Sequence, residues 1–165
     1  PTAIVAVYSY NNGFILDEIC YQKGLSNKQI ADILLLQAKA FVIADSAEPK
    51  SIDEIKSYGL TVFGAVKGSD SVRHRIQAVQ DQRISVTKRS VNIIREYRNY
   101  LWATDRNGEL ISPNEPEHQF SHSMDALGYA IVSLPRVYSS LTPDQKAEIA
   151  FRKKMLQNKR KQYQY

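Results

Sequence analysis

The sequence contains a single cysteine, Cys20, among 165 residues, so no disulfide can form within the chain. Stable disulfides belong mainly to oxidising compartments, and a chain without one is typical of a reducing compartment. No apolar run approaches the roughly 20 residues of a membrane span, and no secretory leader is visible. We therefore expect a protein without a membrane segment, whose length suits one compact core.

Most of the chain also lacks an excess of charge of either sign. The formal net charge is +5, but residues 137–165 hold seven Lys and Arg against two acidic residues. Residues 1–136 hold 15 basic and 15 acidic residues, so their net charge is zero. This distribution argues against a basic nucleic-acid-binding surface that extends over the whole protein. It predicts a domain at residues 1–136 followed by a basic helical tail at residues 137–165.

Strand and helix signals alternate along the chain. Residues 2–10 and 14–19 are rich in strand-forming side chains, and Asn12-Gly13 between them predicts a hairpin turn. The short apolar runs at 40–44 and 61–66 are typical of strands covered on both faces. Helices are predicted after a capping box at Ser26, from Ser51 to Gly59, after Gly68, from Ser90, from Ser121 to Leu134 with a stop at Pro135, and after Thr142. The order predicts an α/β fold: an antiparallel hairpin plus parallel βα units in one mixed sheet, flanked by helices.

An acid closes one of the apolar runs. In FVIADSAEPKSI, Asp45 follows the predicted strand at residues 40–44, and Glu48 comes shortly before Pro49. In open α/β sheets, ligands bind at the carboxyl ends of the strands. The alternative is that Asp45 only caps the following turn, because Asp is a common turn residue.

A second acidic feature lies in the stretch FSHSMDALGYAIVSL. On a helix, His122 and Asp125 share one face, Tyr129 lies one turn further, and Leu127 and Ile131 can face the core. A simpler interpretation is that Asp125 is an ordinary first-turn acid. Together with Asp45, however, this pair indicates a site for Mg²⁺ or Mn²⁺, which prefer oxygen ligands. Two such ions, about 3.5–4 Å apart, can flank a phosphodiester. Zinc is disfavoured because there is no Cys/His cluster.

Other side chains are weaker candidates. Glu48 is either an outer-shell partner of a metal ligand or a turn residue. Lys67 is placed to contact a phosphate as a point charge, and Arg73 and Arg75 could line a DNA groove with it. Each of these basic side chains could equally be a solvated surface residue. No GxxxxGK[ST] motif occurs, so the sequence contains no P-loop ATPase signature.

Five stretches carry a resemblance to a known family. In order, TAIVAVY, FILDEI, FVIADSAEPKSI, GAVKGSDSVRHRIQ and HSMDALGYA resemble the nuclease domain of the large terminase subunit of tailed bacteriophages, over about residues 1–134. The resemblance implies a ribonuclease-H-like fold and a metal-dependent endonuclease that cuts concatemeric viral DNA during packaging, using two Mg²⁺ or Mn²⁺ ions. It also implies double-stranded DNA, a portal protein and a small terminase subunit as partners, an ATPase domain upstream, and the host bacterial cytoplasm as location.

The resemblance also assigns residues. Asp45 looks like the acid of the central strand, Asp125 like the helix acid, and His122 like the histidine found in one branch of the family. The family places its first catalytic Asp on an opening strand ahead of a segment like PTAIVAVY. Because the sequence begins at Pro1 without a methionine, we expect a fragment or a processed product. Either its first strand and first acid lie upstream, or the chain lacks one metal ligand and is catalytically impaired. Asp17 is a weaker substitute, because in FILDEI it is expected to end a hairpin strand.

Two other functions stay open on the sequence alone. One is a different ribonuclease-H-like nuclease, of the resolvase or integrase type, acting on branched DNA. The other is a non-catalytic module whose basic tail docks on DNA or on the portal.

Overall fold

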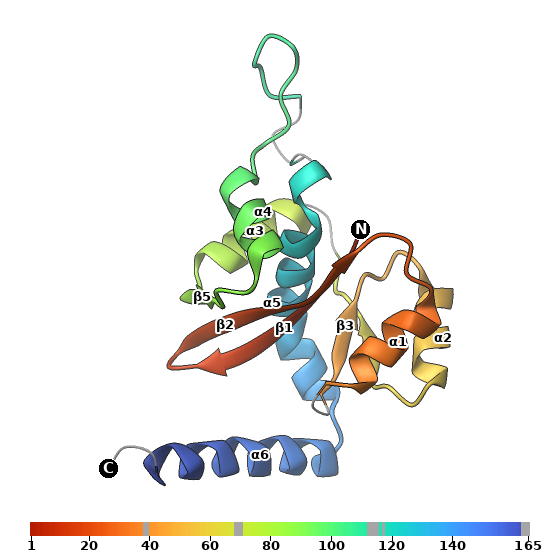
Figure 1. The fold of residues 1–165 in the computed structure, drawn as a ribbon, viewed down its shortest axis with the longest axis vertical. Coiled ribbons are helices and arrows are strands. Elements are labelled where there is room, and N and C mark those ends of the chain that lie inside the picture. Colours follow the sequence, from red (N-terminus) through yellow and green to blue (C-terminus); the bar gives the residue numbers. More distant parts are fainter. Residues whose placement is uncertain (38–39, 68–70, 112–115, 117, 163–165) are drawn as a thin grey trace. The chain divides into compact units, whose positions relative to one another are not determined.

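The computed structural model describes residues 1–37, 40–67, 71–111, 116 and 118–162 (Figure 1). The chain divides into two compact units, Pro1–Ser133 and Leu134–Tyr165. This division falls close to the boundary expected after residue 136. Within the described part of the chain, no helix has both the length and the apolar character that crossing a membrane requires.

The hairpin predicted at the start of the chain is present. Strand β1 (Thr2–Tyr10) pairs antiparallel with β2 (Gly13–Gln22), and Tyr10 lies opposite Gly13. The turn residues are Asn11 and Asn12, with φ of 47° and 58°, so the predicted turn at Asn12-Gly13 is wrong by one position. Gly13 instead begins β2, where an added Cβ would collide with the Arg83 carbonyl oxygen. The glycine therefore permits close approach of two backbones.

The strands form two separately hydrogen-bonded groups. Strand β5 (Ile84–Val86) pairs parallel with β2, which gives a mixed sheet in the order β1-β2-β5. Strands β3 (Val42–Ala44) and β4 (Val62–Gly64) form a parallel pair. The predicted mixed α/β fold class is confirmed, but the single continuous sheet is not seen among the described residues. In that part of the chain no strand pairs with the second edge of β1 or of β3.

Six α-helices and one short 3-10 helix are present in the described ranges. They are α1 (Asn27–Leu35), α2 (Pro49–Ser57), α3 (Ser71–Gln80), α4 (Val91–Asn99), the 3-10 helix His118–Phe120, α5 (His122–Ser140) and α6 (Pro143–Gln162).

Two helix boundaries differ from the sequence prediction. Helix α2 begins at Pro49 rather than at Ser51, because proline is well suited to the first helical position. Helix α5 continues through Pro135, where a stop was predicted. Proline removes one intrahelical hydrogen bond, and a helix of 19 residues retains the others. The capping box at Ser26 and Gln29 is confirmed.

Two hydrophobic clusters hold the first unit together. One contains Leu16 of β2, Ile93 of α4, and Leu127 and Ile131 of α5. The predicted inward orientation of the two α5 side chains is therefore confirmed. Burial of each such side chain contributes about 1.5–3 kcal/mol, so this cluster fixes the first half of α5 against β2.

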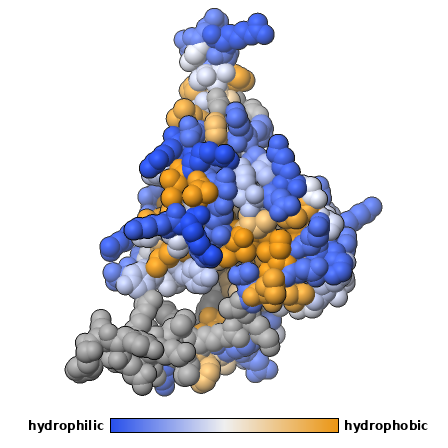
Figure 2. Space-filling model, in the orientation of Figure 1, coloured by the Kyte–Doolittle hydropathy of each residue, from blue (hydrophilic) through white to orange (hydrophobic). Residues whose placement is uncertain are grey.

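The second cluster lies between the β3–β4 pair and helices α1 and α2. Its buried members are Ala31, Ile52, Ile55 and Val62. Hydrophobic residues also reach the surface on the side that carries α1 and β3 (Figure 2). At the end of α1, Leu35 and Leu36 are 52% and 85% exposed. This cluster fixes β3, and with it the position of Asp45 at the strand end.

Candidate functional site

Asp45 lies immediately after β3, at the carboxyl end of the parallel pair. Its Oδ1 accepts a hydrogen bond from the Ala47 backbone N–H at 2.9 Å and forms an ion pair with the ammonium group of Lys67, which follows β4. Its Oδ2 accepts a hydrogen bond from the Tyr129 hydroxyl at 3.3 Å. The side chain is 49% exposed, so it is held in place and still open to solvent. The backbone contact shows that the turn-capping interpretation is also part of its role.

These contacts set the charge of the carboxyl group. Burial alone would raise the pKa of Asp45, but the hydrogen bonds from Lys67 and from the Ala47 N–H outweigh it and lower that pKa. The same contact with Asp45 raises the pKa of Lys67. The pair therefore consists of a carboxylate and an ammonium group at neutral pH.

Asp125 occupies the first turn of α5 and pairs with Arg75 of α3. Arg75 Nη2 donates to Asp125 Oδ1 at 2.7 Å, with 8% of the Arg75 side chain and 29% of the Asp125 side chain exposed. Gly128, one turn further along α5, permits this approach, since an added Cβ would lie 3.2 Å from the Arg75 Cβ. Arg75 is thus covered by α5 and is not presented to the surface as a groove-lining residue would be. Arg73 is exposed on the same helix, and a contact of either residue with DNA stays a prediction.

Tyr129 connects the two ion pairs. The Arg75 guanidinium lies over its ring at 4.5 Å from the centroid, the Lys67 ammonium lies at 5.3 Å, and its hydroxyl reaches Asp45. Burial raises the pKa of the Tyr129 hydroxyl. We call Asp45, Lys67, Arg75, Asp125 and Tyr129 the acid–base cluster. Tyr129 and Arg75 link two acids that are far apart in the sequence, and a cation shared by Asp45 and Asp125 stays a prediction.

The structure also places the remaining candidates. Glu48 precedes α2 and accepts a hydrogen bond from the Ser51 hydroxyl at 2.9 Å. It lines, together with Asp45, a groove formed with side chains of α1 and α2. Asp17 does not end a strand as expected, because β2 continues to Gln22. Its carboxylate instead binds Arg89 and Thr87, which ties β2 to the segment after β5.

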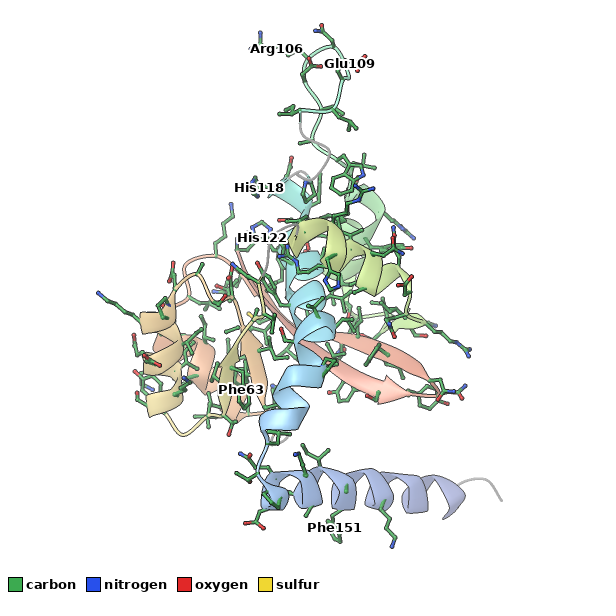
Figure 3. All side chains as sticks on the ribbon, turned by 180° about the vertical axis from the view of Figure 1, so that it is seen from behind. Phe63, Arg106, Glu109, His118, His122 and Phe151 are labelled. Atoms are coloured by element: carbon green, nitrogen blue, oxygen red, sulfur yellow. The ribbon has the colours of Figure 1, made fainter. Side chains whose placement is uncertain are left out.

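His122 is the first residue of α5 (Figure 3), one turn before Asp125. Its described contacts are with Glu96 of α4, 3.5 Å from Nδ1 to Oε1, and with the ring of Tyr21. Sequence reasoning missed Glu96, because an acid within an amphipathic helix pattern gives no sign of being buried.

The chemistry of these side chains fits a hard divalent cation. Carboxylate oxygens and one imidazole are the donors that Mg²⁺ and Mn²⁺ accept. Asp45 and Asp125 each already face a cationic group of this chain, so both positions suit positive charge. Among the described residues, no three His, Cys, Asp or Glu side chains converge as a ligand set. A complete site therefore needs at least one further ligand or a rearrangement of these side chains.

Comparison with known sequences supports a single family. Residues 2–133 match the family described as "Terminase RNAseH like domain". The terminase large subunit of Bacillus phage SPP1 is 36% identical over 126 residues, which cover 73% of this chain and 29% of that protein. The PBSX phage terminase large subunit of Bacillus subtilis strain 168 is 30% identical over 117 residues, covering 67% and 26%. The chain thus spans less than a third of the length of these relatives.

Solved structures agree with this assignment. The nuclease domain of the SPP1 large terminase, g2p, solved with bound Mn, matches with a TM-score of 0.66 and 33% identity over 78% of this chain and 76% of that one. The large terminase of a thermophilic bacteriophage shares the fold, with a TM-score of 0.63 and 21% identity over 78% and 35%. The ribonuclease-H-like fold expected from the resemblance is therefore confirmed. This chain belongs to the family of ribonuclease-H-like domains of the terminase large subunit.

Proposed function

We propose that this chain is the nuclease domain of a phage terminase large subunit and that it cuts concatemeric viral DNA during genome packaging. The observation that carries the proposal is the acid–base cluster, in which Tyr129 binds Asp45 and packs against Arg75, the ion-pair partner of Asp125. The bound Mn in the related SPP1 domain supports divalent-metal chemistry at these acids. Family membership favours this function over a resolvase or integrase.

The acids and the histidine have distinct roles in this proposal. Asp45 and Asp125 would hold two divalent ions, with the ring of His122 as a further ligand and Glu48 orienting a ligand from outside. When bound, such ions lower the pKa of water and stabilise charge on the phosphate and the leaving oxygen. Asp45 is negatively charged at neutral pH, and a bound ion would displace or share the contact that Lys67 makes with its Oδ1.

Basic side chains near the acids would position the DNA. The Lys67 side chain is 35% exposed beside Asp45, and its ammonium group is suited to a phosphate oxygen as a point charge. Arg73 is exposed on α3 and would add a backbone contact, while Arg75 holds Asp125 in place. Contacts with phosphates carry no sequence information, so we expect low sequence specificity.

A further acid would come from a strand that precedes Thr2 in the full-length protein. Two observations support this part of the proposal. The second edges of β1 and β3 are unpaired among the described residues. A groove of about 320 Å³ is lined by Thr2 at the start of β1, by Ala44 and Asp45 at the end of β3, and by side chains of α1 and α2. A strand paired with both edges would join the two groups of strands and bring its side chains close to Asp45.

The wider role rests on the longer relatives. We propose double-stranded DNA as substrate, an upstream ATPase domain in the same polypeptide, and contacts with a portal protein and a small terminase subunit in the cytoplasm of the host bacterium. Each of these belongs to the whole subunit, of which this chain covers a part.

Plasmid nicking in the presence of Mn²⁺ tests the proposal. The 165-residue chain and a form extended upstream into the full-length subunit should be compared. Asp45→Asn and Asp125→Asn should abolish cutting, and His122→Ala should weaken Mn²⁺ binding. Asp53→Asn is the matched control, because Asp53 is an exposed acid of α2 paired only with Lys56 in the described contacts. Wild-type rates in both acid variants of the extended form would refute the assignment.

A further inference from the structure

Glu96 of α4 is a carboxylate with no exposed surface. Its Oε1 accepts a hydrogen bond from the Tyr21 hydroxyl at 2.6 Å, and its Oε2 accepts one from the Ser123 backbone N–H at 2.5 Å. Burying an ionisable group is costly unless its oxygens are bound by donors. Glu96 therefore links its own helix, α4, to β2 and to the first turn of α5. The residue that it binds in α5, Ser123, is two positions before Asp125 of the acid–base cluster.

His122 stands beside this carboxylate with an unsatisfied ring nitrogen. Its Nδ1 is buried, has no hydrogen-bond partner among the described residues, and lies 3.5 Å from Glu96 Oε1. The Tyr21 ring packs edge-on against the imidazole, with centroids 6.1 Å apart. The His122 side chain remains 31% exposed. One nitrogen of the ring thus faces a buried acceptor, while the ring as a whole stays accessible.

A small rotation of the ring would convert this contact into a hydrogen bond. A neutral imidazole carries one N–H, and the hydrogen bond made by one nitrogen decides which nitrogen keeps a lone pair. Histidines that bind metals usually donate their second N–H to a carboxylate or carbonyl oxygen, which fixes the tautomer and the ring orientation. Glu96 is placed to accept this proton.

We propose that Glu96 is the positioning residue for His122: it accepts the Nδ1–H and leaves the Nε2 lone pair for a divalent cation. This inference rests on the proposed function, in which His122 is a metal ligand. Through the Ser123 N–H, the same carboxylate also fixes the first turn of α5, which carries Asp125. One buried acid would then orient two of the candidate ligands.

A purely structural role for Glu96 makes different predictions. Suppose that Glu96 serves only to accept the hydrogen bond from the Ser123 N–H in the first turn of α5. A side chain that keeps an acceptor for Ser123 should then leave the His122 tautomer and the Mn²⁺ affinity unchanged. Glu96→Gln keeps that acceptor but places an amide NH₂ where Oε1 faces His122. The amide would donate to Nδ1 and favour the opposite tautomer, with the proton on Nε2.

The test uses the 165-residue chain and two readouts. Nitrogen-15 NMR of the metal-free protein should show His122 as the Nδ1–H tautomer in wild type and as the Nε2–H tautomer in Glu96→Gln. Mn²⁺ affinity, measured by electron paramagnetic resonance, should fall about 10–100-fold in Glu96→Gln. In a His122→Ala background, the same substitution should cause no further loss. Tyr21→Phe is the control, because it removes the other hydrogen bond to Oε1 and keeps the ring against His122.

The outcomes separate the inference from the function. An Nε2–H tautomer in the wild type, or an equal loss of Mn²⁺ affinity with and without His122, would overturn the positioning role alone. Wild-type Mn²⁺ affinity in Asp45→Asn and Asp125→Asn would overturn the proposed metal site, and the inference with it.

Discussion

Gly128 offers a direct test of how the acid–base cluster is packed. It lies in the middle of the first half of α5, where glycine is the poorest helix former after proline. Replacement by alanine should stabilise an ordinary helix by about 1 kcal/mol. At this position, however, the new methyl group would meet Arg75, the residue that binds Asp125.

The contacts decide the sign of the effect. An added Cβ would lie 3.2 Å from the Arg75 Cβ, 3.3 Å from its Cδ and 3.4 Å from its Nε. The first of these atoms is fixed by the α3 backbone, so a rotation at the end of the side chain cannot relieve it. Overpacking of this kind costs about 1–3 kcal/mol. Set against the gain in helix propensity, the net loss in the free energy of unfolding should be about 1 kcal/mol.

Urea denaturation and thermal denaturation, each monitored by circular dichroism, measure this loss. In a chain of this size, about 1 kcal/mol corresponds to a fall in Tm of about 2–4 °C. Repeating the substitution in an Arg75→Ala background removes the contacts with Cδ and Nε but keeps the one with Cβ, so Gly128→Ala should then cost less than it does in the otherwise wild-type chain. A rise in Tm for Gly128→Ala in the otherwise wild-type chain would show that α3 does not press on α5 as described.

Three other predictions concern residues outside the cluster. Asp17→Asn should lower the free energy of unfolding by about 1–3 kcal/mol at neutral pH. The hydrogen bond from Arg89 outweighs the opposing effect of burial and lowers the pKa of Asp17. The stabilisation is therefore present above about pH 4 and is lost as the pH falls. In the variant, the free energy of unfolding should depend less on pH at acidic pH. Ser133→Ala should cost about 1–3 kcal/mol in urea denaturation, because the fully buried hydroxyl accepts the Val66 N–H at 2.9 Å. Deleting residues 146–165 should flatten the salt dependence of DNA affinity in fluorescence anisotropy, because fewer counterions are released; an unchanged slope would remove the tail from DNA binding.

Local sequence signals were sufficient for most elements of the fold. The hairpin, the capping box at Ser26 and the strands ending near Asp45 and Lys67 each follow from a short pattern with a physical cause, although these strands are less buried than their apolar runs predicted. The hairpin turn was misplaced by one residue because the prediction assigned Gly13 to positive φ. Its actual cause, close approach to the Arg83 carbonyl group, involves a segment distant in the sequence, which no local pattern contains.

The same limit applies to the site. Asp45 and Asp125 could be identified as candidate site residues from the sequence, because one follows a strand and the other lies in the first turn of a helix. Their ion-pair partners could not be identified, because Lys67 and Arg75 look like surface cations in the sequence. Only the packing of α3 against α5 shows that Arg75 is buried. Glu96 was missed for the same reason, since burial of an acid depends on donors from other elements.

The pairing of Asp45 with Lys67 leads to a prediction that separates two roles of the lysine. As an ion-pair partner, Lys67 occupies Oδ1 of a candidate metal ligand. As a basic side chain at the groove, it is suited to bind phosphate. Lys67→Met removes both functions while keeping most of the side-chain volume. Mn²⁺ affinity without DNA should therefore rise, and DNA affinity at low salt should fall.

The carboxyl group itself reports the change. In the wild type, the hydrogen bond from Lys67 opposes the effect of burial and lowers the pKa of Asp45, so its contribution to stability is present above about pH 4 and lost as the pH falls through the lower value. In Lys67→Met that pKa should rise, and this part of the acid dependence should shrink. Carbon-13 NMR of the side-chain carboxyl group measures the pKa directly. Lys56→Met is the control, since its partner Asp53 is exposed on α2. An unchanged pKa of Asp45, or a fall in Mn²⁺ affinity, would mean that the ammonium group does not compete for this carboxylate in solution.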